Sequence, residues 1–248
     1  MKPVDTHCHL NFERFDDDRE KVVERSKKEL EFVVNAGSNM ETNKKALKLG
    51  ENYPGFIIPN LGLHPTYTND FDQLGEIKKM IREEDPIAVG EIGLDHYHVK
   101  QDKVQKKQKK VFQKMLELAE ELDKPVVIHS REAEKKVFEI VQEYSIPEIM
   151  FHCFNGQPEL AEKAAEENIK IGFTTQVLYS NRAQELAKRI ELDDMLLETD
   201  SPFLYRGDRN EPLNVKESAE KIAELKQVKR EKVVEKTTRN ARNIFHES

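Results

Sequence analysis

Short apolar runs alternate along the 248-residue sequence with longer segments in which apolar residues recur at helical spacing. In the longest such segment Val111, Met115 and Leu118 follow one another at steps of four and three, which places them on one helix face. Pro125 then ends that helix and begins the next apolar run. The apolar runs predict eight strands, at residues 4–10, 31–36, 56–63, 87–94, 125–129, 148–151, 169–173 and 195–199.

Eight strands, each followed by a helical segment, predict a parallel sheet. In about 250 residues, closure into a TIM (β/α)8 barrel is favoured over an open doubly wound sheet. No glycine-rich GxGxxG or GxxxxGK[ST] loop follows the first strand, which disfavours the nucleotide-binding alternative. Because no linker or change in composition interrupts the pattern, we expect one α/β domain over residues 1–248.

Charge and composition restrict the class of protein. With 40 Lys and Arg against 47 Asp and Glu, the net charge is −7, which argues against a protein that coats nucleic acid through a broad positive field. The charge does not exclude an enzyme that binds phosphate through metal ions. No apolar run approaches the roughly 18 residues that span a bilayer, and two cysteines cannot form a disulfide framework. Since no signal peptide is apparent, we expect a cytoplasmic protein.

Seven of the eight histidines lie within or just beyond a predicted strand. Barrel enzymes place their chemistry at the carboxyl ends of the strands, so this distribution is the first functional signal. On the first strand His7 and His9 share one face, and Asp5 shares it with them. Two such imidazoles can chelate one ion, with the carboxylate in support, or they are hydrogen-bonded core histidines; the pair alone does not decide.

Further candidates lie at the ends of the fourth, fifth and sixth strands. Glu91 interrupts an apolar run, where a carboxylate is costly unless it is paired or bound to metal, and a carboxylate can bridge two ions. Asp95, further out, either caps the following helix or supports the site. His129 and His152 each end an apolar run, which places an imidazole at the barrel mouth.

Three more positions have both a functional and a structural interpretation. Asp200 shares strand parity with Glu198 but lies nearer the mouth, so it is the better ligand or general base, although its surroundings also fit a turn. His64, held extended by Pro65, either contacts substrate or is an ordinary loop histidine. Arg131 either clamps an anion such as phosphate or forms a surface ion pair.

Other motifs favour no metal. His96 and His98 repeat the spacing of the first pair, but they lie in a predicted loop. Cys8 and Cys153 alternate with candidate ligands, so we expect them to face the helix layer as buried free thiols. The remaining candidates are too many for one zinc ion and suit two metal ions that share Glu91. They are His7, His9, Glu91, His129, His152 and Asp200.

The sequence resembles the TatD family of metal-dependent hydrolases, within the amidohydrolase-like barrels. One departure is Asn155, where that family usually has Ser. The match extends over the whole chain, in family order, and rests on residues 5–10, 62–65, 90–95, 129–131, 152–156, 198–202 and 209–214.

The resemblance implies a TIM barrel with a pair of divalent ions at its mouth, and a deoxyribonuclease that includes 3′→5′ exonuclease action on single-stranded or damaged DNA. Its expected partner is DNA, as single strands or 3′ ends, with no membrane and no obligate protein partner. His7, His9 and Asp200 would hold one ion, His129 and His152 the other, and Glu91 would bridge them.

The mechanism expected from this resemblance is hydrolysis by a metal-bound hydroxide. Metal coordination lowers the pKa of water toward about 7, and Asp200 would take the proton as general base. Arg131 or His64 would help the metals to offset charge on the phosphoryl oxygens. Four imidazoles suit zinc, manganese, iron or nickel better than magnesium, which prefers oxygen ligands.

DNA binding by a chain of charge −7 requires a local positive surface. Six lysines lie in the segment after the fourth strand, and Arg206 and Arg209 follow the eighth. Together they predict a funnel for the phosphate backbone, with a merely solvated helix face as the alternative. The lysines are Lys100, Lys103, Lys106, Lys107, Lys109 and Lys110.

Two rival functions stay open. Relatives linked to D-aminoacyl-tRNA deacylation raise the possibility of a metal-dependent ester hydrolase. Glu91 stands where many amidohydrolases carry a modified lysine, which disfavours cyclic amides as substrates but not such esters. A non-catalytic metal- or nucleic-acid-binding barrel would not need Asp200 as a base, and the presence of Asp200 argues against that function.

Overall fold

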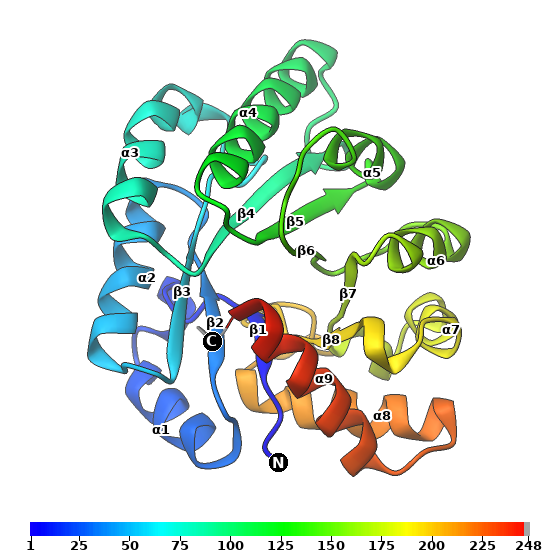
Figure 1. Ribbon diagram of the computed structural model, residues 1–248. Helices are drawn as coiled ribbons and strands as arrows, with labels where there is room; N and C mark the ends of the chain where they lie inside the picture. Colours follow the sequence, from blue (N-terminus) through cyan, green and yellow to red (C-terminus); the bar gives the residue numbers. More distant parts are fainter. Residues whose placement is uncertain (246–248) are drawn as a thin grey trace.

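A computed structural model describes residues 1–245 and contains one eight-stranded parallel sheet, in which the strands follow one another in sequence order (Figure 1). Each predicted strand is present, and the helices form a ring around the sheet, which confirms the barrel fold. The strands are β1 (Asp5–Cys8), β2 (Val33–Ala36), β3 (Ile57–Leu61), β4 (Ala88–Asp95), β5 (Val126–Arg131), β6 (Ile149–Phe151), β7 (Lys170–Phe173) and β8 (Met195–Leu197).

The helices follow from the spacing of apolar residues and from local capping. In α2, for example, the Asn39 side chain accepts a hydrogen bond from the Thr42 peptide nitrogen, and the Thr42 side chain bonds back to the Asn39 backbone. The α-helices are α1 (Arg19–Glu29), α2 (Met40–Asn52), α3 (Leu74–Glu84), α4 (Asp102–Glu121), α5 (Glu134–Val141), α6 (Pro158–Glu166), α7 (Asn181–Arg189), α8 (Val215–Lys226) and α9 (Arg230–Phe245). Short 3-10 helices are η1 (Glu13–Phe15), η2 (Thr68–Gln73), η3 (Thr175–Leu178), η4 (Leu192–Asp194) and η5 (Pro212–Asn214).

The ring is closed where β1 meets the segment after β8. The peptide nitrogen of His9 donates to the Ser201 carbonyl at 2.7 Å, and that of Asp200 donates to the His7 carbonyl at 2.9 Å. The buried Asp5 carboxylate accepts hydrogen bonds from the peptide nitrogen and hydroxyl of Thr199, at 2.8 and 2.6 Å. This seam brings His7 and His9, near the start of the chain, beside Asp200.

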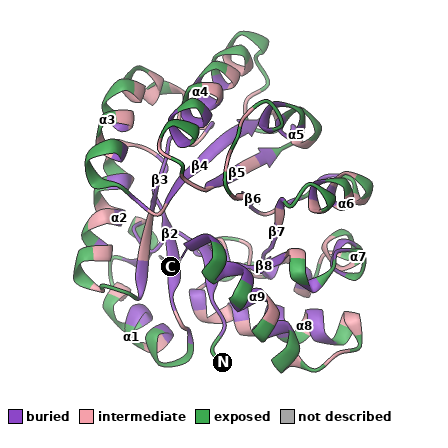
Figure 2. Ribbon diagram, viewed as in Figure 1, coloured by how far each residue is buried: buried purple, intermediate pink, exposed green. Residues whose placement is uncertain are grey.

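Buried apolar residues form two clusters, one between the strands and the helices and one inside the ring. The strands are mostly buried, whereas much of each surrounding helix is exposed (Figure 2). Cys8 is fully buried in the layer between strands and helices, as expected. Inside the ring, the second residues of β2 and β5, Val34 and Val127, pack with Ile244 and Phe245 of α9. The carboxyl end of α9 reaches the middle of the ring (Figure 1) and closes the barrel at the amino ends of its strands.

Three predicted strands end earlier in the structure. The first strand was expected to reach Leu10, the third Leu63 and the eighth Thr199, but they end at Cys8, Leu61 and Leu197. Beyond these points single main-chain hydrogen bonds replace the regular ladder, from Glu198 to Phe173 of β7 and from His64 to Ser38 in the loop after β2. None of the helices within residues 1–245 combines the length and the apolar character that crossing a membrane requires.

Candidate metal centre

A cavity of about 540 Å³ opens at the carboxyl ends of the strands. Loops from both halves of the barrel contribute to its wall, and Glu91 of β4 lies in it, buried to 3% exposure. The predicted site residues in the wall are His9, His64, Glu91, His129, Arg131, His152 and Asp200, and His7 lies fully buried beneath them.

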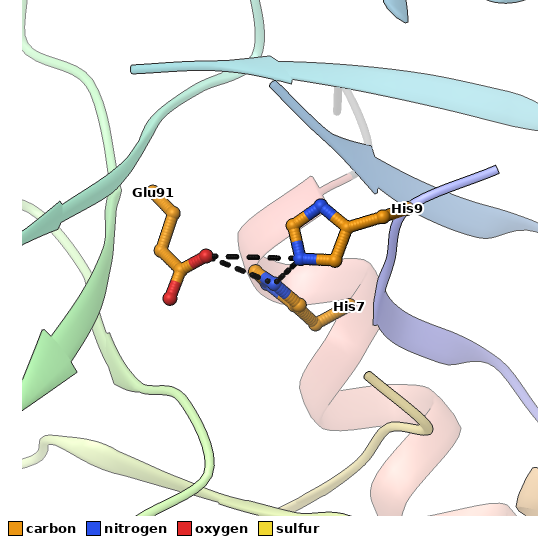
Figure 3. A group of neighbouring side chains, drawn as sticks. All are labelled: His7, His9 and Glu91. Carbon is orange, nitrogen blue, oxygen red and sulfur yellow. Dashed lines mark hydrogen bonds and ion pairs between the residues drawn. The ribbon is translucent and has the colours of Figure 1, made fainter. Parts of the chain in front are cut away.

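One oxygen of Glu91 faces the first pair of histidines (Figure 3). Oε2 lies 3.4 Å from Nε2 of His7 and 3.8 Å from Nε2 of His9, and these two nitrogens are 3.2 Å apart. Oδ1 of Asp200 adds a carboxylate oxygen 3.4 Å from Nε2 of His9. Two imidazole nitrogens and two carboxylate oxygens therefore converge on one point.

The other oxygen of Glu91 faces a second set of imidazoles. Oε1 lies 3.0 Å from Nδ1 of His129 and 3.8 Å from Nε2 of His152. Nε2 of His64 lies 3.4 Å from the same oxygen. The two oxygens of one buried carboxylate thus point at two different groups of nitrogens, the arrangement that a bridging ligand requires.

The outer nitrogens of the rings are held by acceptors that fix their orientation. Nδ1 of His9 lies 3.0 Å from the Ala36 carbonyl, which can only accept, so Nδ1 carries the hydrogen and Nε2 presents a lone pair to the cavity. Nε2 of His129 is 2.9 Å from Oδ2 of the buried Asp95. Nδ1 of His152 is 2.8 Å from Oε2 of the buried Glu198. Such partners hold metal-ligating imidazoles in position.

Burial and neighbouring charge act in opposite directions on these groups. Burial disfavours charge on His129 and His152, but the carboxylates around them outweigh it and raise the pKa of His129 to about 9 and that of His152 to about 10. Burial likewise opposes ionisation of Glu91, yet His64, His7 and His152 lower its pKa well below the ordinary value. The cavity floor therefore holds ionised carboxylates among imidazoles whose inner protons a divalent ion would replace.

The donor set fits divalent metal ions. Imidazole nitrogens and carboxylate oxygens suit zinc and its first-row neighbours, and the atoms of each group lie close enough to share one ion. His7, His9 and Glu91 form one such group, and His64, Glu91 and His129 form another.

His64 lies in the cavity wall beside Glu91. Its Nδ1 accepts a hydrogen bond from the Thr66 peptide nitrogen at 3.3 Å. Burial lowers the pKa of His64. Because the Thr66 peptide nitrogen can only donate, Nδ1 accepts and the ring hydrogen is on Nε2, which faces Glu91. His64 therefore presents a hydrogen-bond donor to the cavity.

Arg131 lies at the rim, where its guanidinium stacks over the ring of Tyr97 at 4.1 Å. Within residues 1–245 this stacking contact, and no ion pair, is found for the Arg131 guanidinium. His98, in the loop expected to bind no metal, bonds through Nδ1 to Asp95 at 2.9 Å.

Two expectations are corrected by the structure. Cys153 lines the cavity instead of facing the helix layer, because its backbone leaves the strand with φ of 46° and the alternation of faces stops there. Arg209 is not available to a phosphate funnel, since both its terminal nitrogens bond to Asp18, at 2.6 and 2.7 Å, and one also bonds to Glu211.

Glu198 and Asp95 are completely buried, and each holds an imidazole. The sequence pattern predicted no role for Glu198 and only an alternative one for Asp95. Glu198 could have been found because it lies two residues before Asp200, so that in an extended strand both side chains share one face. For Asp95 the available signal was a carboxylate four residues after Glu91 in the same apolar run.

Comparisons with known proteins identify relatives of this chain. Bacillus subtilis YabD, described as an uncharacterized metal-dependent hydrolase, is 38% identical over 97% of this chain and 98% of its own length. Human deoxyribonuclease TATDN3 is 33% identical, over 98% of this chain and 94% of its own length. The crystal structure of YJJV, a TatD homologue from Escherichia coli K12, superposes with a TM-score of 0.87 at 26% identity, over 99% and 98% of the two chains. The model of the TatD related DNase family matches residues 4–246, and the chain belongs to that family.

Proposed function

We propose that the protein is a deoxyribonuclease that hydrolyses phosphodiester bonds with the help of two divalent metal ions and acts 3′→5′ on single-stranded ends. The observation that carries the proposal is the orientation of Glu91, whose two oxygens face two separate sets of imidazole nitrogens. The family match and the name of the human relative support DNA as the substrate.

In this proposal His7, His9 and Asp200 hold one ion, His129 and His152 hold the other, and Glu91 bridges them. Bound ions of this kind supply a water of lowered pKa and positive charge opposite the phosphoryl oxygens. The protein adds a buried, rigid wall around them, in which Asp95 and Glu198 keep two of the imidazoles in place.

Asp200 is the base in this proposal. Burial opposes its ionisation, but His9, His152 and His7 outweigh that effect and lower its pKa, so the carboxylate is free to accept a proton at neutral pH. Its Oδ1 lies between His9 and His152, at 3.4 and 3.7 Å, on the boundary of the two groups. The attacking water would give its proton to the carboxylate of Asp200 as its bond to phosphorus forms and the bond from phosphorus to the leaving oxygen breaks.

Two further side chains would act on the phosphate. His64 presents an N–H to the cavity and is suited to bond to a phosphoryl or leaving oxygen. Arg131 carries its charge at the rim, where the next phosphate of a strand would lie.

The test is cleavage of end-labelled single-stranded DNA by chelator-treated protein, with manganese, zinc and magnesium added back separately. An Asp200→Asn protein purified in parallel controls for contaminating nuclease. Metal-dependent shortening that disappears in the variant supports the proposal, and the label released first gives the polarity. Absence of cleavage with every metal, in protein that binds two ions, would contradict it and favour ester or aminoacyl-tRNA hydrolysis.

A further inference from the structure

The exposed aromatic side chains of the protein gather at the barrel mouth. Among residues 1–245, four large apolar side chains are exposed: Met1, Tyr97, Tyr179 and Phe203. Tyr97, Tyr179 and Phe203 lie in the segments that follow β4, β7 and β8, at the end of the barrel that holds the cavity. Exposed rings clustered at a functional opening are a feature of binding surfaces.

One group of these rings lies at the seam between β1 and β8. Phe203 is 39% exposed and lines the cavity. Its ring stands edge-on to Phe12, with centroids 6.0 Å apart, and Phe12 in turn stacks on His9 at 4.5 Å. The guanidinium of the exposed Arg14 lies 5.7 Å from the Phe203 ring. We call Phe203 and Arg14 the seam platform.

A second group follows β4 and β5. Tyr97 is 46% exposed, and the guanidinium of Arg131 stacks over its ring at 4.1 Å. The ammonium of Lys100 lies 5.2 Å from the same ring and also pairs with Glu132. We call Tyr97 and Arg131 the far platform.

The order of the strands places these platforms across the opening from each other. β1 and β8 are neighbours at the seam, and β4 and β5 are the strands farthest from that seam in a ring of eight. Glu91, with the imidazoles on either side of it, lies in the cavity between the two edges.

We propose that a single nucleic-acid strand crosses the mouth from one platform to the other, with an unpaired base stacked at each and the scissile phosphate between them. The proposal rests on the deoxyribonuclease function proposed above and adds how the strand is held. Each platform combines an aromatic ring with a cation. The ring can stack on any base, and the cation can pair with the phosphate next to that base. Bases inside a duplex are covered by their neighbours, so the arrangement selects unpaired ends.

The test compares ring-removing with ring-retaining variants. Tyr97→Ala and Phe203→Ala should each raise KM for oligothymidylate roughly 5- to 150-fold, the range expected for loss of one base–aromatic contact. Tyr97→Phe and Phe203→Tyr should stay near the wild-type KM. The same oligomer with hydrogen in place of every base should bind weakly to all these proteins, with no difference between alanine and aromatic variants. Metal content and melting temperature show whether each variant is intact.

A binding measurement gives a second readout. In the Asp200→Asn protein, an oligomer with 2-aminopurine in place of one base should lose fluorescence on binding when that base stacks on a ring. When Tyr97→Ala or Phe203→Ala is added to Asp200→Asn, fluorescence should return only for 2-aminopurine placed on that ring's side of the scissile phosphate. DNA cleavage with an unchanged KM in both alanine variants would overturn the platforms and leave the nuclease proposal standing. Absence of DNA cleavage in the wild-type protein would overturn both.

Discussion

Nδ1 of His152 lies 2.8 Å from Oε2 of Glu198, and the other oxygen of that carboxylate accepts a hydrogen bond from the Cys153 peptide nitrogen at 2.6 Å. Glu198 is completely buried behind the imidazole and does not face the cavity. It therefore orients His152 from behind, and with His7 and His152 it also forms a further group whose atoms lie close enough to share an ion.

Replacement of Glu198 tests this role. Glu198→Gln keeps the shape but removes the charge that holds His152, so we expect the affinity for one of the two ions to fall roughly 10- to 100-fold. Competition with a chromogenic chelator measures the change. Glu185→Gln, which alters an exposed helix carboxylate paired with Lys188, is the matched control and should leave the affinity unchanged. An equal loss in both variants would refute a specific role for Glu198.

A small change at Gly172 of β7 should act on the same carboxylate. A Cβ atom built on Gly172 would lie 2.5 Å from Oε1 of Glu198, closer than any real contact allows. Gly172→Ala must therefore push Glu198 away from His152, and we expect weaker metal retention and a lower melting temperature. Gly75→Ala is the control, because nothing lies within 4 Å of a Cβ at that helix position. Unaltered metal affinity in Gly172→Ala would show that the carboxylate can move without consequence.

Glu91 should control both ions at once. Glu91→Ala removes the carboxylate that faces both sets of nitrogens, so we expect it to lose most of both bound ions while the circular dichroism spectrum of the fold is kept. Metal analysis after gel filtration gives the ratio of ion to protein. Glu134→Ala changes another carboxylate in the cavity wall and should retain both ions. Loss of a single ion from Glu91→Ala would contradict the bridging assignment.

The predicted lysine funnel can be tested by charge reversal at the start of α4. Lys106 and Lys107 are exposed one turn into that helix. Lys106→Glu with Lys107→Glu should weaken DNA cleavage and flatten its dependence on salt. Lys27→Glu with Lys28→Glu makes the same change in net charge at the end of α1, away from the mouth. Identical kinetics in the two double variants would contradict the funnel.

The ion pair between Asp18 and Arg209 predicts a pH dependence of stability. Hydrogen bonds from Arg209 lower the pKa of Asp18 below its ordinary value of 3.8. A carboxylate with a lowered pKa in the folded state stabilises the fold above that ordinary value and loses this effect as the pH falls through the folded value. At pH 7 we expect Asp18→Asn to cost about 1 kcal/mol, or ~2–4 °C in melting temperature, and the difference from wild type to shrink as the pH falls below 3.8. A constant difference down to pH 2 would contradict this.

The sequence predicted the strands, their order and the residues at their carboxyl ends. This was possible because strands buried on both faces appear in a sequence as continuous apolar runs. His7, His9 and Asp200 could be expected at one opening for the same reason. The partners of the rings could not, since the pairing of Glu198 with His152 depends on how two strands are rotated against each other. Cys153 was placed on the wrong side because alternation holds only while the backbone stays extended.

Arg209 shows a similar limit for charged residues. Its position after β8 indicates the correct end of the barrel, but pairing with Asp18, 191 positions earlier in the chain, is a tertiary contact with no sequence signal. For the far platform, the sequence singled out Arg131 but did not predict that Arg131 stacks on Tyr97.

The packing of Phe245 and Ile244 inside the amino-terminal end of the ring makes the cavity a dead end. A polymer cannot pass through such a barrel, so any molecule that reaches Glu91 must enter and leave through the same opening. Product must therefore leave through the same opening by which new substrate enters. Processive cleavage of a long strand would depend on contacts between the strand and the residues around this opening, because the barrel does not encircle the strand.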